Sequence, residues 1–243
     1  MIKKNTIIKI EDRDTFLWNK NNFESIKNVN VDLKNRNLYL IVEGERVYIK
    51  LLNLPKVSKD KLYKMIEYQL KYYFTDMEDI LFDYYICKKL KKSYEIMVFC
   101  INSRKINNLH GLLEKGTKLK LVNLIQFVIL NYVKNYVDDK EYTLLFENNR
   151  NVYIMAIKND ILVDNSMIRD FTGDFQEFFL EFSPIIENQL MDIENNKVYV
   201  LWFEYEDILK ELERKYKLVI LDYKEKNIIE NFTKDWKYRM CIK

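Results

Sequence analysis

The spacing of apolar residues is clearest in the segment LPKVSKDKLYKMIEYQLKYYF, which begins one residue before Pro55. Leu62, Ile66 and Leu70 recur every four residues, and charged residues fill many of the positions between them. This period predicts a helix with one apolar face packed on a sheet. Pro55 has no N–H to donate and disfavours helix in the residue before it, so we expect the preceding strand to end there. Ser58 is a suitable N-cap for the helix.

The end of this helix carries the aromatic run YQLKYYF. If the helical spacing continues, Leu70 and Tyr73 face the core, while Tyr72 and Phe74 fall partly outside it. Exposed aromatic side chains near a helix end are typical anchors of a protein interface. The alternative is that these aromatic residues line a crevice between two lobes.

Alternating apolar residues predict strands through the rest of the first half. Residues 38–42 and 47–51 read as the two arms of a hairpin across Glu43-Gly44. The other elements predicted here are strands at 6–10, 15–19, 80–86, 94–101 and 118–124, and helices from about 103 to Gly116 and at 125–136.

The second half begins with a similar pattern. Residues 142–148 and 151–158 read as a hairpin across Asn149-Arg150, and a third strand follows at 161–168. A phenylalanine-rich helix comes next, in which Pro184 is expected to produce a kink or to separate two pieces. A strand, a charged helix and a last strand complete the order β-β-β-α-β-α-β. This order predicts an α/β protein with two related lobes of mixed sheet and helix.

Composition narrows the choice of function. The 243 residues are 48% apolar and 14% aromatic, which is typical of a folded protein with one large domain or two small ones. The net charge is only +3 and is spread along the chain, so we do not expect a nucleic-acid partner. One short basic run, KKLKK at 88–92, is predicted to be a turn. It is either simply solvated or in contact with an acidic partner or lipid headgroups.

Residues suited to catalysis or metal binding are few. Cys87, Cys100 and Cys241 are far apart and lack metal-ligand spacing, and we expect no structural disulfide. His110 is the only histidine and lies beside Gly111 on a predicted helix, away from the strand ends, so a catalytic triad is not expected.

Acidic residues cluster at a few places, such as Asp138-Asp139 and Asp76, Glu78 and Asp79. We expect these carboxylates in turns or at helix starts, without a bound metal. The N-terminus lacks the apolar core of a signal peptide, and no window approaches the length of a membrane span. The chain as given is therefore expected to be soluble and cytoplasmic.

Several stretches of the first half resemble a known family. They are Leu54-Pro55 with the helix after it, Asp83 and Tyr84 in the strand that follows, and Lys115-Gly116 before the next strand. In this order they are similar to the insert of PilM, the actin-like cytoplasmic assembly protein of type IV pili, and to the cytoplasmic part of GspL in type II secretion. The likeness covers roughly residues 45–225, and Asn123 departs from the aspartate common in the family.

This resemblance implies an α/β fold of mixed sheets, actin-like (ribonuclease H-like), with two lobes and an inserted PilM-type subdomain. Residues 1–53 and 117–140 would form the first, degenerate lobe, and residues 54–116 the insert. Residues 141–243 would form the second lobe and a C-terminal segment.

Relatives of this kind bind ATP through three glycine-bearing loops, because phosphates need close backbone N–H groups. The corresponding segments here are IEDRD at 10–14, FENNRN at 146–151 and VLWFEY at 200–205, and none contains glycine. Glu11 and Glu147 add carboxylates that would repel a triphosphate. We therefore expect a degenerate member with no cofactor and no ATPase activity. The alternative is a divergent actin-like or sugar-kinase-like ATP-binding enzyme.

The implied role is a scaffold for a type IV pilus or type II secretion machine, peripheral at the inner face of the cytoplasmic membrane. Its implied partners are the N-terminal tail of a PilN-like membrane protein and the assembly ATPase, and self-association is also open. The predicted partner-binding residues flank a groove beside the 80–86 strand: Tyr72, Phe74, Phe82, Tyr84 and Ile86. The segment NIIENFTKDWKYRMCIK reads either as a docking helix or as a juxtamembrane segment of a longer chain.

Overall fold

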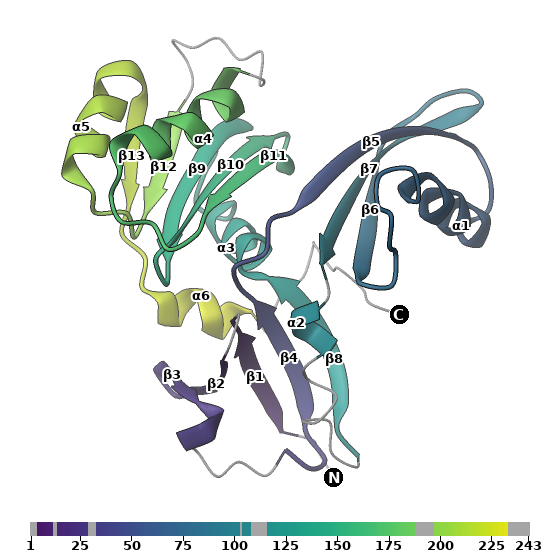
Figure 1. Ribbon diagram of the computed structural model, residues 1–243, viewed down its shortest axis with the longest axis horizontal. Helices are drawn as coiled ribbons and strands as arrows, with labels where there is room; N and C mark the ends of the chain where they lie inside the picture. The colour runs from purple at the N-terminus through teal and green to yellow at the C-terminus, as the bar shows by residue number, and fades with distance from the viewer. Residues whose placement is uncertain are drawn as a thin grey trace. The chain divides into compact units, whose positions relative to one another are not determined.

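A computed structural model describes six ranges of the chain: residues 4–11, 14–28, 33–102, 104–107, 116–187 and 197–232. The described residues fall into two compact units, one up to Asn123 and one from Leu124 onward (Figure 1). The predicted division into two lobes and an insert is a different one and stays a prediction.

The first unit contains a five-stranded sheet in the order β3-β2-β1-β4-β8. β1 pairs antiparallel with β2 and parallel with β4, and the two strands predicted at the start of the chain are confirmed. The centre of the sheet is dry, because Ile8, Leu38 and Leu40 have no exposed surface. Its strands are β1 (Asn5–Ile10), β2 (Thr15–Asn19), β3 (Asn22–Ser25), β4 (Asn37–Val42) and β8 (Lys118–Leu124), with a short 3-10 helix η1 (Ile26–Asn28) after β3.

The hairpin predicted across Glu43-Gly44 is wrong. β4 lies between β1 and β8, whereas the residues expected to pair with it belong to another sheet. The chain crosses between the sheets at Gly44, whose φ of +67° is a conformation that glycine adopts at little cost. Alternation specifies that a strand has two faces, but it does not specify the partner strand.

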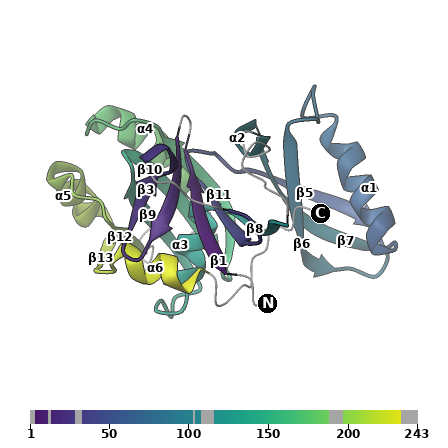
Figure 2. The same ribbon diagram turned by 90° about the horizontal axis from the view of Figure 1, so that it is seen from below.

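The same unit contains a three-stranded antiparallel sheet in the order β5-β7-β6, with α1 along one face (Figure 2). The predicted helix, its apolar face and the end of the preceding strand at Pro55 are all confirmed. Leu62, Ile66 and Leu70 are buried against the sheet. The bounds are β5 (Tyr48–Pro55), α1 (Lys59–Leu70), β6 (Ile80–Lys89), β7 (Ser93–Asn102) and α2 (Arg104–Asn107). The rest of the helix predicted up to Gly116, including His110, lies outside the described residues.

The second unit is built on a five-stranded mixed sheet in the order β11-β10-β9-β12-β13. The predicted order β-β-β-α-β-α-β is confirmed, and α4 runs through Pro184 to Glu187. The strands are β9 (Glu141–Asn148), β10 (Asn151–Lys158), β11 (Ile161–Ile168), β12 (Lys197–Leu201) and β13 (Lys217–Leu221). The helices are α3 (Ile125–Val133), α4 (Phe175–Glu187), α5 (Glu206–Lys215) and α6 (Glu225–Asn231).

An aromatic core joins α4 to one face of this sheet. Phe178 and Phe182 are fully buried, and Phe171 packs edge-on against Tyr205 with ring centroids 4.9 Å apart. On the opposite face, Phe146 stacks on Tyr153 at 4.6 Å. Apolar surface buried on both faces makes this sheet a rigid support for the loops at the ends of its strands.

None of the helices in the described part of the chain combines the length and the apolar character that crossing a bilayer requires.

Candidate functional site

An open pocket of about 430 Å³ lies in the second unit, at the carboxyl ends of two neighbouring strands. β9 and β12 run parallel, with Leu145 opposite Val200 and Phe146 opposite Leu201, so the loops that follow them meet. The pocket is lined by Glu147, Asn148, Asn149, Trp202, Glu204 and Tyr205. In open α/β sheets, ligands bind at this edge. The structure thus brings two of the three segments examined for nucleotide binding into one site.

The pocket is dominated by negative charge. Burial raises the pKa of the Glu147 carboxyl, the nearby Glu204 carboxylate raises it further, and Arg150 opposes them. Burial and the charge of Glu147 likewise raise the pKa of the Tyr205 hydroxyl. A carboxyl whose ionisation is already disfavoured by burial and by a neighbouring negative charge forms a poor site for a triphosphate.

The backbone of the pocket is shaped by residues in the left-handed region. The hairpin predicted across Asn149-Arg150 is confirmed, and these two residues have φ of +48° and +61°, as in a type I′ turn. Trp202 has φ of +56°, and its indole N–H donates to the carbonyl of Tyr223 at 2.6 Å. A bulky side chain therefore occupies a backbone conformation that glycine adopts most easily.

The carboxyl end of β1, in the first unit, carries a buried ionic cluster. Lys9 Nζ lies 3.0 Å from a carboxylate oxygen of Glu11 and 3.4 Å from one of Glu43. The side chains of Lys9 and Glu43 are only 6% and 1% exposed. The ammonium also lies 4.7 Å from the centre of the Phe23 ring. Glu11, which belongs to the first segment compared with a phosphate-binding loop, is thus paired with an internal cation.

Lysine 105 continues this cluster. Its Nζ donates to the carbonyl oxygen of Glu43 at 2.7 Å and lies 3.0 Å from the Glu45 carboxylate. Glu43, Glu45 and Lys105 are all buried, so the loss of one charged side chain would leave its partner's charge uncompensated in the interior. The cluster therefore holds the chain on both sides of its crossing at Gly44.

Four of the five predicted partner-binding residues lie on the side of the three-stranded sheet that α1 covers. Phe74, Phe82, Tyr84 and Ile86 are half-buried and pack against the core beneath α1. Tyr72 alone is mostly exposed, at 70%. Their role in binding a partner stays a prediction.

The predicted burial of Tyr73 is wrong. α1 ends at Leu70, and a tight turn, in which the N–H groups of Tyr73 and Phe74 both point to the Leu70 carbonyl, replaces the helical spacing. Phe74 consequently packs inward, edge-on to Tyr48 with ring centroids 5.9 Å apart, and Tyr73 is 52% exposed.

The sequence reasoning overlooked the other face of the three-stranded sheet. Leu51 and Tyr85 are 60% and 45% exposed there, and both pair in register with Met97. The sequence signal for this face was the set of residues in β5 and β6 that alternate with the core-facing ones. β6 is also an edge strand, so its outer backbone groups are not paired in the sheet.

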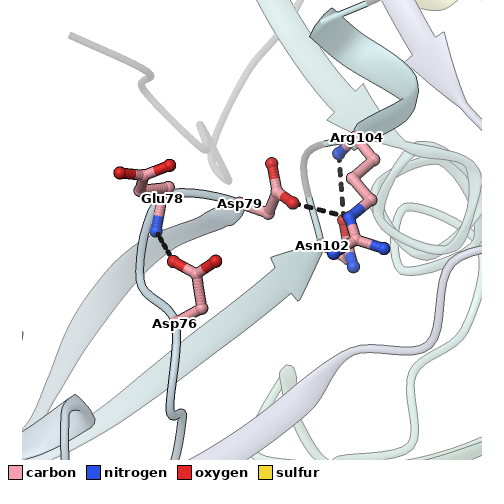
Figure 3. Close-up of polar contacts among 5 residues, drawn as sticks. All are labelled: Asp76, Glu78, Asp79, Asn102 and Arg104. Atoms are coloured by element: carbon pink, nitrogen blue, oxygen red, sulfur yellow. Dashed lines mark hydrogen bonds and ion pairs between the residues drawn. The ribbon is translucent and has the colours of Figure 1, made fainter.

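The acidic turn before β6 is organised by hydrogen bonds (Figure 3). Asp79 accepts from Arg104 Nε at 2.5 Å, and Asp76 accepts from the backbone N–H of Glu78 at 2.8 Å. Asn102 accepts from the backbone N–H of Arg104 at 2.9 Å. Among the residues that the structure describes, no cluster of three or more His, Cys, Asp or Glu side chains could hold a metal ion.

Several solved structures are similar to this protein over nearly the whole length of its chain. A Bacteroides thetaiotaomicron protein with an actin-like ATPase fold and unknown function superposes with a TM-score of 0.57 and 12% identity, covering 94% of each chain. This chain has an actin-like fold.

Two further structures with this fold come from assembly machines. A chain of the PilM–PilN type IV pilus biogenesis complex is similar with a TM-score of 0.59 and 9% identity, over 92% of this chain and 90% of that one. The cytoplasmic domain of EpsL, an inner membrane component of the type II secretion system of Vibrio cholerae, is similar with a TM-score of 0.54 and 8% identity, over 97% of each chain.

The sequence itself matches no protein-family model and no curated protein. The similarity therefore shows the actin-like fold predicted from the sequence and does not by itself assign an activity.

Proposed function

We propose that this chain is a non-catalytic scaffold of a type IV pilus or type II secretion assembly machine, peripheral at the inner face of the cytoplasmic membrane. It binds the N-terminal tail of a PilN-like membrane protein and links that protein to the assembly ATPase. The observation that carries the proposal is the fold shared with PilM and the EpsL cytoplasmic domain over more than nine-tenths of this chain.

The charge of the pocket supports the non-catalytic part of the proposal. Glu147 and Glu204 stand at the strand ends, where an ATPase of this fold would need N–H donors and a cation. On the other unit, Lys9 already neutralises Glu11. The carboxylates of the pocket would repel a triphosphate, and the positive charge of Lys9 is already used by Glu11. Neither place therefore favours a triphosphate.

The first test is thermal unfolding with and without millimolar Mg-ATP, and then with a peptide from the N-terminus of the PilN-like partner. A ligand at 100 times its dissociation constant adds about 2.7 kcal/mol to the free energy of unfolding, which raises Tm by several degrees. We expect a shift with the peptide and none with Mg-ATP. A shift of several degrees with Mg-ATP would instead place the protein among divergent actin-like or sugar-kinase-like ATP-binding enzymes.

A substitution locates the peptide site. Tyr72→Ser changes an exposed predicted contact residue and is expected to weaken the peptide-induced shift without lowering the Tm of the free protein. Leu180→Ser, on α4, is the matched control, because Leu180 is 75% exposed and is not a predicted contact. If both variants lose the peptide-induced Tm shift equally, or if neither loses it, the result contradicts a site beside Tyr72.

A further inference from the structure

Five lysines gather at one end of the three-stranded sheet. We call them the lysine tip, and they are Lys56, Lys88, Lys89, Lys91 and Lys92. All five are exposed, and none forms an ion pair with a residue that the structure describes. This absence matters because both lysines of α5, for example, are exposed and paired with a glutamate one turn away.

The backbone holds the lysine tip together. The N–H of Leu90 donates to the carbonyl of Ser93 at 3.0 Å and closes the β6–β7 turn. The N–H of Lys56 donates to the carbonyl of Lys92 at 3.1 Å and ties the end of β5 to that turn. The five charges thus come from segments far apart in the sequence and share one end of the sheet, opposite the end from which β7 continues into α2 (Figure 1).

Few carboxylates offset this charge. Glu95 lies opposite Lys88 in the β6–β7 register and is half-buried, and Asp60 lies in the first turn of α1. Five exposed lysines therefore have two carboxylates in the neighbouring segments, and the Lys56 ammonium also lies 5.7 Å from the centre of the Tyr94 ring. The excess is positive and local, although the whole chain has a net charge of only +3.

The chemistry of the lysine tip favours a diffuse anionic surface over a shaped anionic ligand. Lysine carries a compact, hydrated charge on a flexible stem, whereas recognition of one carboxylate or phosphate in a fixed geometry typically uses the planar fork of arginine. All five residues are lysines, and they lie just after β5, at the end of β6 and in the β6–β7 turn. Half-buried Leu90 is the first residue of the β6–β7 turn.

We propose that the lysine tip binds the surface of a lipid bilayer that contains anionic phospholipid. Clusters of four to eight basic residues are attracted to such surfaces, and the attraction acts within about one Debye length. Half-buried Leu90, within the turn, would then lie next to the interfacial region of the bilayer. This inference concerns lipid alone and does not depend on a PilN-like partner or on the absence of nucleotide binding.

The test is co-sedimentation of the whole chain with vesicles. We expect binding to vesicles of phosphatidylcholine and phosphatidylglycerol in equal amounts and none to phosphatidylcholine alone. Binding should disappear near 1 M salt, where the Debye length is about 3 Å. Each lysine near an anionic surface strengthens binding roughly fivefold, so Lys91→Gln/Lys92→Gln should weaken it about 25-fold.

A matched variant separates the lysine tip from general basicity. Lys61→Gln/Lys64→Gln removes the same charge from two exposed lysines on α1, which also lack an ion pair with a described residue. It should change vesicle binding less than about threefold. Equal weakening by both double variants overturns the proposal. So does unchanged vesicle binding after all five tip lysines are replaced by glutamine. Binding to poly-glutamate without binding to anionic vesicles also overturns it, in favour of an acidic protein partner.

Discussion

At the scale of single residues, the buried charges are the most informative feature. Lys9 and Glu43 are almost fully buried, and their separation of 3.4 Å is that of an ion pair. Such a pair adds little net stability compared with a well-packed apolar pair, but the loss of one partner leaves an uncompensated charge in the core. The cluster is therefore sensitive to single changes and tolerant of paired ones.

We expect Lys9→Met to lower the free energy of unfolding by about 3 kcal/mol or more, because Glu43 loses its buried cation. The double variant Lys9→Met/Glu43→Gln should recover much of that loss. Urea unfolding of the three proteins measures the coupling between the two residues. Lys27→Met is the control, since the Lys27–Asp14 pair is exposed and its loss should cost under about 0.5 kcal/mol. Equal losses for Lys9→Met and Lys27→Met would contradict a role for burial.

Asp139 gives a second test at this scale. Its carboxylate accepts two hydrogen bonds from Lys197 Nζ, at 2.7 and 2.8 Å, and one from the Tyr199 hydroxyl. The bond from Lys197 is the main cause that lowers the pKa of Asp139 below 3.8. A lowered pKa means that the stabilisation is fully present above about pH 4 and is lost as the pH falls through the lowered value.

Asp139→Asn should therefore lower the free energy of unfolding by about 1–2 kcal/mol at pH 7. The difference from the unmodified protein should shrink as the pH falls below about 4. Urea unfolding between pH 7 and pH 3 measures both effects. Asp138→Asn is the neighbouring control and should change stability by less than about 0.5 kcal/mol, because Asp138 is exposed. A constant difference across the pH range would argue against ionisation as the cause.

At the scale of elements, the three-stranded sheet and α1 form one cooperative structure. Leu70 and Ile66 have no exposed surface, and Cys100 lies in the same core. Burial raises the pKa of the Cys100 thiol to about 12, whereas Cys87 on the edge strand β6 is exposed. The two thiols therefore report on different states of the same sheet.

In a Cys241→Ser variant, we expect one thiol to react quickly with a disulfide reagent at pH 8 and the second to react only when the sheet opens. Adding Ile66→Ala removes buried side-chain volume under α1 and should speed the slow reaction about 30-fold or more. Leu180→Ala, in the other unit, is the control and should leave the slow rate unchanged. If both thiols react quickly in the Cys241→Ser variant that keeps Ile66, the sheet is not closed over Cys100.

At the scale of the whole molecule, local patterns predicted elements better than partnerships. The period of α1, the hairpin across Asn149-Arg150 and the order of the second half followed from side-chain spacing and turn positions. The false hairpin arose because β4 has apolar alternation that suits any partner strand. The two segments of the pocket were indicated by the family resemblance and not by side-chain spacing, because Glu147 and Glu204 are far apart in sequence and meet only through the parallel pairing of β9 with β12.

The contact of Lys105 with Glu43 and Glu45 has a consequence for how such a chain can evolve. Glu43 follows β4, where the chain leaves the five-stranded sheet, and Lys105 follows β7, after the chain has passed through the three-stranded sheet. The Lys105 Nζ and the Glu43 carbonyl oxygen are 2.7 Å apart, so the two ends of the intervening segment lie side by side. A segment whose two ends meet can be lengthened, shortened or exchanged in one genetic event without changing the strand order of its host. The surface residues and the binding partner of the three-stranded sheet can therefore change rapidly, while the five-stranded sheet keeps its sequence constraints.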